Sequence, residues 1–276
     1  MVEKKLKAVI CAIAKNENAY INDWVNWHLR IGFDHIYLFD NNESPSDYVG
    51  NFIDEIDKVT IYDVNDIREE NLQTKCYNKF YLENRDEFDW CLFCDIDEFL
   101  SGVNDIKHFL CDEKFSCFDQ IRITWKTFSD GDMIERDMSI PVYKAFKHIS
   151  DNEKLNRQAK PIIRGSLRGI SISPHRGIRI NSTDGKIGNL RSCLPSGKNC
   201  TTSEIMTEEV DGDISGEVVF INHYRTKSLS EFIIQKLGRG NACSLKKTID
   251  VDYYWVSNKR TEEKEKFIEK YLRSGA

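Results

Sequence analysis

The first part of the chain alternates between short apolar runs and segments with helical spacing. Residues 8–14, Ala-Val-Ile-Cys-Ala-Ile-Ala, form a near-continuous apolar run, which is typical of a strand buried on both faces. In residues 20–31 large apolar side chains recur on one face of a helix, and Gly32 follows where a helix commonly ends. Further strands are predicted at residues 35–40, 59–62 and 90–94, and a further helix at residues 71–84.

This alternation predicts the α/β class, with a mainly parallel central sheet and helices on its faces. In such sheets ligands bind beyond the carboxyl ends of the strands. Polar clusters follow three of the predicted strands, at residues 15–18, 40–43 and 95–98. We therefore expect a nucleotide-binding site along this edge of the sheet.

The second half of the chain has a less regular pattern. Residues 150–216 are rich in Ser, Asn, Gly and Arg, which suggests short strands joined by long loops. Strands are predicted at residues 120–125 and 218–221, and helices at residues 230–237 and 261–272. The pattern indicates a smaller C-terminal part beside the main sheet.

Composition bounds the class of protein. The 276 residues are 40% hydrophobic and 30% charged, which is ordinary for a globular chain with one sizeable core. No apolar stretch approaches the roughly 20 residues that span a bilayer, and the run at 8–14 is too short for a signal peptide. We therefore expect a cytoplasmic protein. The nine cysteines are too irregularly spaced for a disulfide scaffold, and we expect buried thiols.

Charge is distributed unevenly along the sequence. Residues 1–140 carry 15 Lys and Arg against 29 Asp and Glu, whereas residues 141–200 carry 12 against 3. An acidic half followed by a basic segment suits a site that holds a cation on one side and phosphates on the other, although solvated surface charges also explain much of the count. The acidic half argues against a nucleic acid as partner, because phosphate affinity needs clustered Lys and Arg.

Aspartate pairs separated by one residue occur four times, so the pattern is weak by itself. Only Asp95 and Asp97 end a buried apolar strand, and there both carboxylates are expected to emerge on one side of the sheet edge. Hard oxygen ligands at that spacing suit Mg²⁺ or Mn²⁺ bridging a diphosphate. The other pairs are Asp130/Asp132, Asp211/Asp213 and Asp250/Asp252, and the first two of these contain glycine and are typical of turns.

Four segments in order resemble one enzyme group. Residues 12–42 open with Ala-Ile-Ala-Lys-Asn-Glu-Asn and close with His-Ile-Tyr-Leu-Phe-Asp-Asn-Asn, and residues 89–99 contain Asp-Ile-Asp-Glu-Phe. Residues 125–131 and 221–240 complete the pattern. Together they resemble GT-A-fold glycosyltransferases, most closely the family 92 type and related bacterial family 2-like enzymes. The match covers most of residues 8–240 and is thin between 140 and 215.

The resemblance implies a GT-A-type fold and a role for each matching residue. Asp97, with Asp95, would hold Mn²⁺ or Mg²⁺, and His223 would be a further ligand or contact the diphosphate; a structural histidine is the alternative. Asp40 would contact the nucleoside; the alternative is an aspartate that initiates a turn. The residues predicted at the nucleotide are Lys15, Glu17, Asp40, Asp95, Lys236 and Arg239, the last two of which equally suit a solvated helix face.

The implied reaction has two requirements: the leaving group must be stabilised, and the acceptor hydroxyl must lose a proton. The leaving nucleoside diphosphate develops negative charge, which a metal stabilises without proton transfer. In an inverting enzyme the acceptor hydroxyl loses its proton to a carboxylate base. Asp130, in the loop expected to face the acceptor, is the candidate base, and Asp132 and Glu17 are alternates.

The resemblance implies a hexosyltransferase that uses a UDP-sugar, of galactose type by analogy, and a glycan or lipid-linked oligosaccharide acceptor in bacterial surface polysaccharide assembly. It divides the chain into a catalytic domain, 1–240, and a C-terminal helical extension, 241–276. Within the catalytic domain, residues 1–130 would be the nucleotide-binding half and residues 131–240 the acceptor-side half. The rival hypotheses are a metal-dependent nucleotidyltransferase or phosphatase, and a non-catalytic sugar-nucleotide-binding homologue; the intact Asp95/Asp97 pair argues against the last.

Residues 223–276 carry 12 Lys and Arg against 7 Asp and Glu, and they include several aromatic residues. Residues 253–255 are Tyr-Tyr-Trp, and Phe267 and Tyr271 lie four apart on one side of a predicted helix. One hypothesis is that this narrow stripe packs on the catalytic domain. The other is reversible contact with an anionic membrane, at its inner face, beside a lipid-linked acceptor.

Overall fold

The computed structural model describes residues 5–274 except residues 66, 68, 182, 201–208, 211–213, 239 and 242–243. Within these residues nine strands form one large sheet in the order β3-β2-β1-β4-β7-β6-β12-β5, with β11 paired to β6. Its strands are β1 (Ala8–Ala14), β2 (His35–Asp40), β3 (Val59–Asp63), β4 (Trp90–Phe93), β5 (Glu98–Ser101), β6 (Gln120–Thr127), β7 (Ala159–Arg164), β11 (Ser192–Cys193) and β12 (Phe220–His223). Two small sheets contain β8 (Ile170–Ile172), β9 (Gly177–Ile180) and β10 (Ile187–Asn189), and β13 (Gly240–Asn241) and β14 (Ser244–Thr248).

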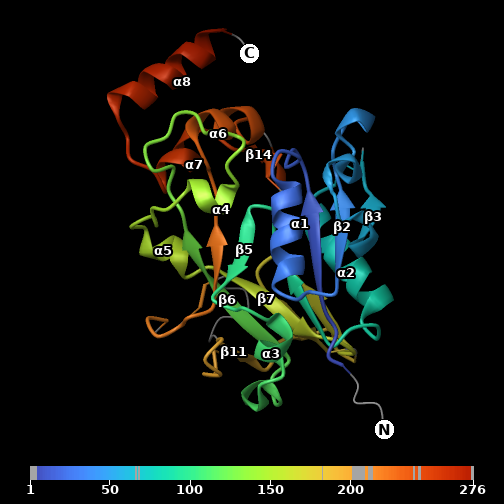
Figure 1. Ribbon diagram of the computed structural model, residues 1–276. Coiled ribbons are helices and arrows are strands. Elements are labelled where there is room, and N and C mark those ends of the chain that lie inside the picture. The colour runs from blue at the N-terminus through green and yellow to red at the C-terminus, as the bar shows by residue number, and fades with distance from the viewer. Residues whose placement is uncertain are drawn as a thin grey trace.

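Helices cover both faces of the large sheet (Figure 1). On β1, Ala8, Ile10 and Ala12 belong to the hydrophobic cluster that contains the buried face of α1, whereas Val9 and Cys11 belong to the cluster that contains α2. Alternation along a strand therefore places the two helices on opposite faces. The helices are α1 (Ile21–Arg30), α2 (Leu72–Asn84), α3 (Ile106–Leu110), α4 (Val142–Ala145), α5 (Glu153–Asn156), α6 (Leu229–Gln235), α7 (Val251–Trp255) and α8 (Glu262–Ser274).

The predicted α/β class is confirmed, with a mainly parallel central sheet, flanking helices and a smaller C-terminal part. β1 pairs in parallel with both β2 and β4, and β2 pairs in parallel with β3. Ala14 lies opposite Asp40, and Asp40 opposite Asp63, so the carboxyl ends of these strands meet at one edge. The structure therefore contains the edge of the sheet at which the sequence predicted a ligand site.

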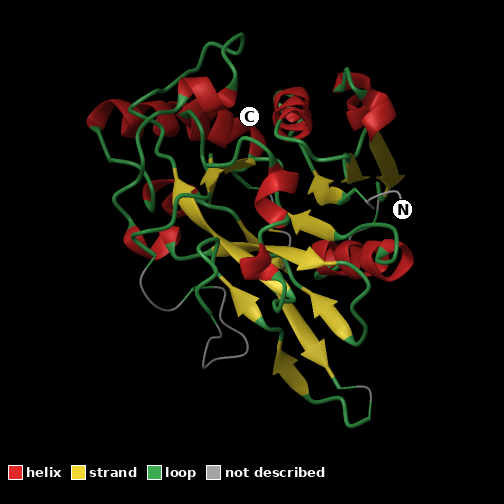
Figure 2. Ribbon diagram, turned by 60° about the horizontal axis from the view of Figure 1, so that its bottom comes forward, coloured by secondary structure: helices red, strands yellow, loops and turns green. Residues whose placement is uncertain are grey.

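Two features of the sheet differ from the sequence pattern. β7 joins β4 and β6 in antiparallel pairing although it lies within the segment 150–216, where only short strands were expected. β12 runs from Phe220 to His223 rather than over 218–221, because it pairs with β5 and β6 up to His223. His223 is therefore the last residue of the strand, not the residue that follows it. Figure 2 shows the strands running through the middle of the molecule, with helices above them and on both sides.

His28 on α1 is buried between the helix and β5. Its Nδ1 lies 2.9 Å from the carbonyl oxygen of Trp24, and its Nε2 accepts a hydrogen bond of 3.2 Å from the backbone N–H of Leu100. These partners assign the proton to Nδ1 and make the ring neutral. Burial lowers the pKa of His28 to about 3, so protonation of this imidazole is strongly disfavoured while the protein is folded.

Acidification is expected to destabilise the fold through His28. The unfolded chain binds this proton below an ordinary pKa of about 6.5, whereas the folded ring does so only near its lowered pKa of about 3. The free energy of unfolding should therefore fall as the pH drops between these values, by about 1.4 kcal/mol per pH unit from this group. Urea unfolding at pH 7 and pH 5 measures the slope. The free energy of unfolding of His28→Gln should depend less steeply on pH than that of wild type, whereas the exposed control His108→Gln should keep the wild-type slope. Equal slopes for His28→Gln and wild type would contradict the lowered pKa of His28.

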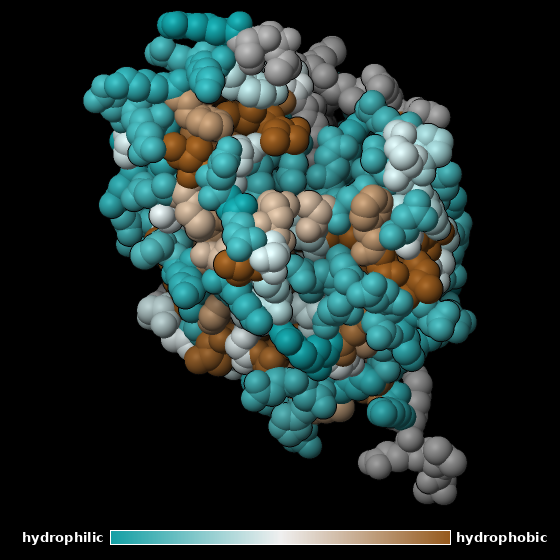
Figure 3. All heavy atoms as spheres, turned by 45° about the horizontal axis from the view of Figure 1, so that its top comes forward, coloured by the Kyte–Doolittle hydropathy of each residue, from teal (hydrophilic) through white to brown (hydrophobic). Residues whose placement is uncertain are grey.

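The C-terminal part forms its own hydrophobic cluster. Leu229 and Phe232 of α6, Tyr254 of α7 and Ile268 of α8 are buried together, and Phe267 packs against them. The stripe predicted on residues 261–272 thus packs on α6 and α7, as the first hypothesis expects, and membrane contact stays a prediction. Among the described residues, no helix is both long and apolar enough to cross a membrane. With this end turned forward, apolar residues on the surface are interspersed with hydrophilic ones (Figure 3).

Candidate functional site

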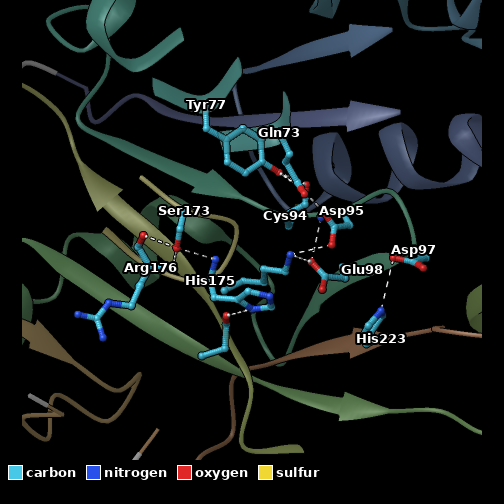
Figure 4. A network of polar contacts seen from close by, with 12 residues as sticks. Gln73, Tyr77, Cys94, Asp95, Asp97, Glu98, Ser173, His175, Arg176 and His223 are labelled. Carbon is cyan, nitrogen blue, oxygen red and sulfur yellow. Dashed lines mark hydrogen bonds and ion pairs between the residues drawn. The ribbon is translucent and has the colours of Figure 1, made fainter. Parts of the chain in front are cut away.

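Asp95 and Asp97 lie in the turn that joins β4 to β5, at the carboxyl end of β4. The N–H of Glu98 donates to the carbonyl of Asp95 at 3.1 Å, and the N–H of Asp95 donates to the Glu98 carboxylate at 2.9 Å. Because β4 already ends at Phe93, strand alternation does not orient the two carboxylates. Asp95 and Asp97 instead belong to two separate networks of hydrogen bonds and ion pairs (Figure 4).

Asp95 belongs to a network built around Lys160. Its carboxylate accepts a hydrogen bond from Gln73 of α2 and lies 2.8 Å from the ammonium of Lys160 on β7. Lys160 also lies 3.3 Å from the Glu98 carboxylate, and its side chain is 0% exposed whereas that of Asp95 is 37% exposed. Burial alone would lower the pKa of Lys160, but the two carboxyls outweigh it and raise that pKa. Burial raises the pKa of Glu98 well above its usual range.

Asp97 lies in a buried cluster of charges. Its Oδ2 is 2.5 Å from Lys236 Nζ and 4.0 Å from Lys227 Nζ, while Oδ1 is 3.5 Å from His223 Nε2. Glu17, from the polar segment after β1, lies 3.7 Å from Lys227. Burial would raise the pKa of Asp97, yet Lys236 and His223 hold that pKa well below its usual range, so the carboxyl is ionised.

His223 contributes a neutral imidazole to this cluster. It stands at the end of β12, with its ring centroid 4.3 Å from that of Trp125. Burial lowers the pKa of His223 despite the nearby Asp97. Its Nδ1 is buried and has no hydrogen-bond partner in the described part of the chain. Nε2 is the ring nitrogen that faces Asp97, and a neutral imidazole carries one lone pair, on the nitrogen without the proton.

Two lysines near Asp95 and Asp97, Lys227 and Lys160, were not predicted as site residues from the sequence. Lys227 precedes the Ser228 cap of α6 with a backbone φ of 57°, in the left-handed region that non-glycine residues rarely adopt. Its side chain is 1% exposed, and its Nζ makes no hydrogen bond within the described residues. Strained backbone and a buried, incompletely paired ammonium both mark functional positions. Lys160 carries no sequence signal, because it lies in a segment of loop-like composition.

The contacts described for two predicted residues, Asp40 and Lys15, are with residues outside this cluster. Asp40 is fully buried, and its carboxylate accepts hydrogen bonds from the N–H and side chain of Asn42 and the N–H of Val49. These are the contacts of a turn-initiating aspartate, the alternative that the sequence left open. Lys15 pairs at the surface with Glu43 at 3.0 Å. Arg239 lies outside the described residues.

Asp130 is held by the C-terminal part. The turn predicted for residues 130–132 is present, with Gly131 and Asp132 at positive φ. The Asp130 carboxylate is 2.7 Å from Lys264 of α8 and accepts a hydrogen bond from the hydroxyl of Tyr254 on α7. Lys264 also lies 2.9 Å from Asp132. These partners belong to its own loop and to residues 254–264, and none of them is part of the Asp97 cluster. The assignment of Asp130 as the base stays a prediction.

The donors around Asp97 fit a divalent metal that also binds a substrate. No three His, Cys, Asp or Glu side chains among the described residues form a ready-made metal site. Mg²⁺ is usually held by one or two carboxylates together with substrate phosphates rather than by an all-protein cage. The ionised Asp97 and Nε2 of the neutral His223, 3.5 Å from Asp97 Oδ1, meet that lesser requirement.

Comparison with solved structures gives partial likenesses, among them those to TarS and WbbM. No family model matches the sequence, and no curated protein matches it. TarS from S. aureus aligns with 48% of this chain at 14% identity and a TM-score of 0.33. The bifunctional glycosyltransferase WbbM aligns with 45% at 11% identity and a TM-score of 0.29. Each alignment spans 24% of the other chain. Likenesses of this extent do not decide an activity, and the case for a function comes from the residues themselves.

Proposed function

We propose that this protein is a divalent-metal-dependent glycosyltransferase that binds a UDP-sugar at the Asp97 cluster. The supporting observation is that Asp97, His223, Lys227 and Lys236 meet at the carboxyl end of β4, where ligands of parallel sheets bind. The chain, as its resemblance to GT-A-fold enzymes suggests, would move a hexose of galactose type to a glycan or lipid-linked oligosaccharide. A surface polysaccharide pathway in bacteria is the setting in which we place it.

The charges of the cluster support a metal requirement. Glu17 and Asp97 carry two negative charges that balance the ammonium groups of Lys227 and Lys236. The cluster therefore has little net positive charge with which to neutralise a nucleoside diphosphate. A bound Mn²⁺ or Mg²⁺ would supply that charge and stabilise the leaving diphosphate.

The chain's own residues would bind and orient the donor. Lys227 can donate to a phosphate oxygen without first losing a hydrogen bond to the protein, because its Nζ makes none in the described residues. Lys236 is anchored by Asp97 and by the carbonyl of Arg225 at 2.6 Å, so its ammonium is fixed in place. A fixed donor stabilises developing charge without the cost of reorganisation.

Proton removal from the acceptor completes an inverting reaction. Asp130 stays the proposed general base, and Asp132 and Glu17 stay its alternates. For this role Asp130 would have to exchange its contacts with Tyr254 and Lys264 for one with an acceptor hydroxyl. The proposal therefore places the acceptor beside the C-terminal part.

Titration calorimetry of UDP tests the proposal. We expect UDP to bind with Mn²⁺ or Mg²⁺ and its affinity to fall by about 100-fold when a chelator removes the metal. The sequence has no glycine-rich phosphate loop after β1, so backbone donors cannot replace the lost charge. ADP under the same conditions is the control for base recognition. Equal UDP affinity with and without chelator would contradict the metal requirement, and no UDP binding at all would contradict the donor.

A further inference from the structure

A polar cavity of about 490 Å³ lies between the loop after β6 and the C-terminal part. Its walls come from residues 129–132, 148–152 and 255–259, three segments far apart in sequence. Carboxylates, amides, hydroxyls, an imidazole, the ammonium of Lys259, the indole of Trp255 and two aliphatic side chains line it. We propose that this cavity is a saccharide-binding subsite for the acceptor of the transfer, a role that rests on the proposed function.

An unsatisfied hydroxyl in the wall supports a polar occupant. Ser257 is 6% exposed, and its Oγ is buried without a hydrogen-bond partner in the described residues. A buried hydroxyl without a partner costs free energy, so a wall that keeps one is explained by an occupant that completes the bond. A sugar hydroxyl both donates and accepts, which matches a serine.

The charges in the wall favour a neutral polyol over a cation. Lys264 Nζ lies 2.7 Å from Asp130 and 2.9 Å from Asp132, so one ammonium is bound to both carboxylates. A metal ion would have to displace that ammonium, whose side chain is almost fully buried. The remaining lone pairs can accept hydrogen bonds from hydroxyl groups. Carboxylates held in this way orient a sugar without carrying uncompensated charge.

Trp255 adds an amphipathic surface at the cavity. It is half-buried at the end of α7, with its ring centroid 5.0 Å from that of Tyr254. This contact with the buried Tyr254 restricts the indole. A rigid aromatic plane beside several hydrogen-bonding groups suits a ring with one apolar face and many hydroxyls.

The cavity is linked directly to the segment that carries His223 and Lys227. Asn258 in its wall donates to Thr226 Oγ1 at 3.0 Å and accepts from the N–H of Asp130 at 2.7 Å. The N–H of Phe128 donates to the carbonyl of His223 at 2.9 Å. Thr226 is three residues from His223, a chain length of at most about 11 Å. A saccharide held here would lie next to the donor site without occupying it.

NMR titration with methyl β-galactoside, methyl α-glucoside and N-acetylglucosamine tests the proposal on the full chain. We expect at least one of these to bind, and Trp255→Ala to weaken it by about tenfold. Ser257→Ala removes a hydroxyl that makes no hydrogen bond within the described residues, so it should spare stability while weakening sugar binding about three- to tenfold. Ser116→Ala, an exposed serine, is the matched control and should bind as wild type.

UDP calorimetry on the same samples separates this subsite from the donor site. The two cavity variants should bind UDP as wild type does. The proposal is overturned if none of the three sugars binds, or if both variants bind them normally. Perturbation of the cavity by Mg²⁺ or Mn²⁺ alone, with no response to the sugars, would likewise overturn it in favour of a cation site. Failure of wild-type protein to bind UDP would count against the proposed function and leave the sugar result standing.

Discussion

Replacing Asp97 with alanine is expected to lower the release of UDP from a UDP-sugar by about 1,000-fold or more. Asp97 is an ionised carboxylate 3.5 Å from Nε2 of His223, and it anchors Lys236. Under the proposed function, its loss would remove both a metal ligand and the anchor of an ammonium group beside the diphosphate, effects worth several kcal/mol in the transition state. The measurement is UDP release in a metal-buffered assay.

Loss of activity must be separated from loss of folding. Asp97→Ala leaves Lys236 and Lys227 buried beside fewer negative charges, and an unpaired buried charge commonly costs roughly 3–5 kcal/mol. The double variant Asp97→Asn/Lys236→Met removes one charge of each sign and should recover much of the stability measured by urea unfolding. It should remain inactive. Near-normal UDP release by Asp97→Ala, or recovery of activity in the double variant, would refute the metal-site assignment.

Lys160→Met is expected to be the most destabilising single change at the site. Lys160 is fully buried between Asp95 at 2.8 Å and Glu98 at 3.3 Å, and its loss leaves two carboxyls without their cation. Breaking such a buried pair costs roughly 3–5 kcal/mol, part of which Glu98 can relieve by keeping a proton, because burial raises its pKa. Thermal and urea unfolding at pH 7 measure the loss.

A double-variant cycle tests the cause of that loss. Lys160→Met/Glu98→Gln removes the cation and its buried partner together, and should be clearly more stable than Lys160→Met alone. The carboxyls raise the folded pKa of Lys160, so its contribution is complete below an ordinary pKa of about 10.4 and is lost only as the pH rises through the folded value. The exposed control Lys186→Met should unfold as wild type does. A Lys160→Met protein as stable as wild type would refute the pairing.

The sequence predicted those parts of the fold that depend on local patterns. The strands at 8–14 and 35–40 coincide with β1 and β2, because side chains buried on both faces of a sheet leave a continuous apolar run. The position of Asp95 and Asp97 at the carboxyl end of β4 follows from the same pattern. His223 and Lys236 were predicted from resemblance, and the structure brings both to Asp97.

Other features depended on contacts between segments far apart in the chain. Lys160 lies next to Asp95 because β7 pairs with β4 in antiparallel register, with Leu92 opposite Ile162. No local sequence pattern predicted β7. Asp40 is the last residue of β2, and Asp97 lies in the turn after β4, so both aspartates are near the same edge of the sheet. The loop at Val49 folds back on the Asp40 carboxylate and buries it.

The sequence by itself therefore determined the class of fold and the edge of the sheet at which polar side chains gather, since both follow from periodic burial over a few residues. Only the tertiary structure decided which charges pair there. Asp97 and Lys236 are separated by 139 positions and Asp130 and Tyr254 by 124. Register and packing across the whole sheet set such distances, and the energy of a charge pair depends on those distances and on burial rather than on spacing along the chain.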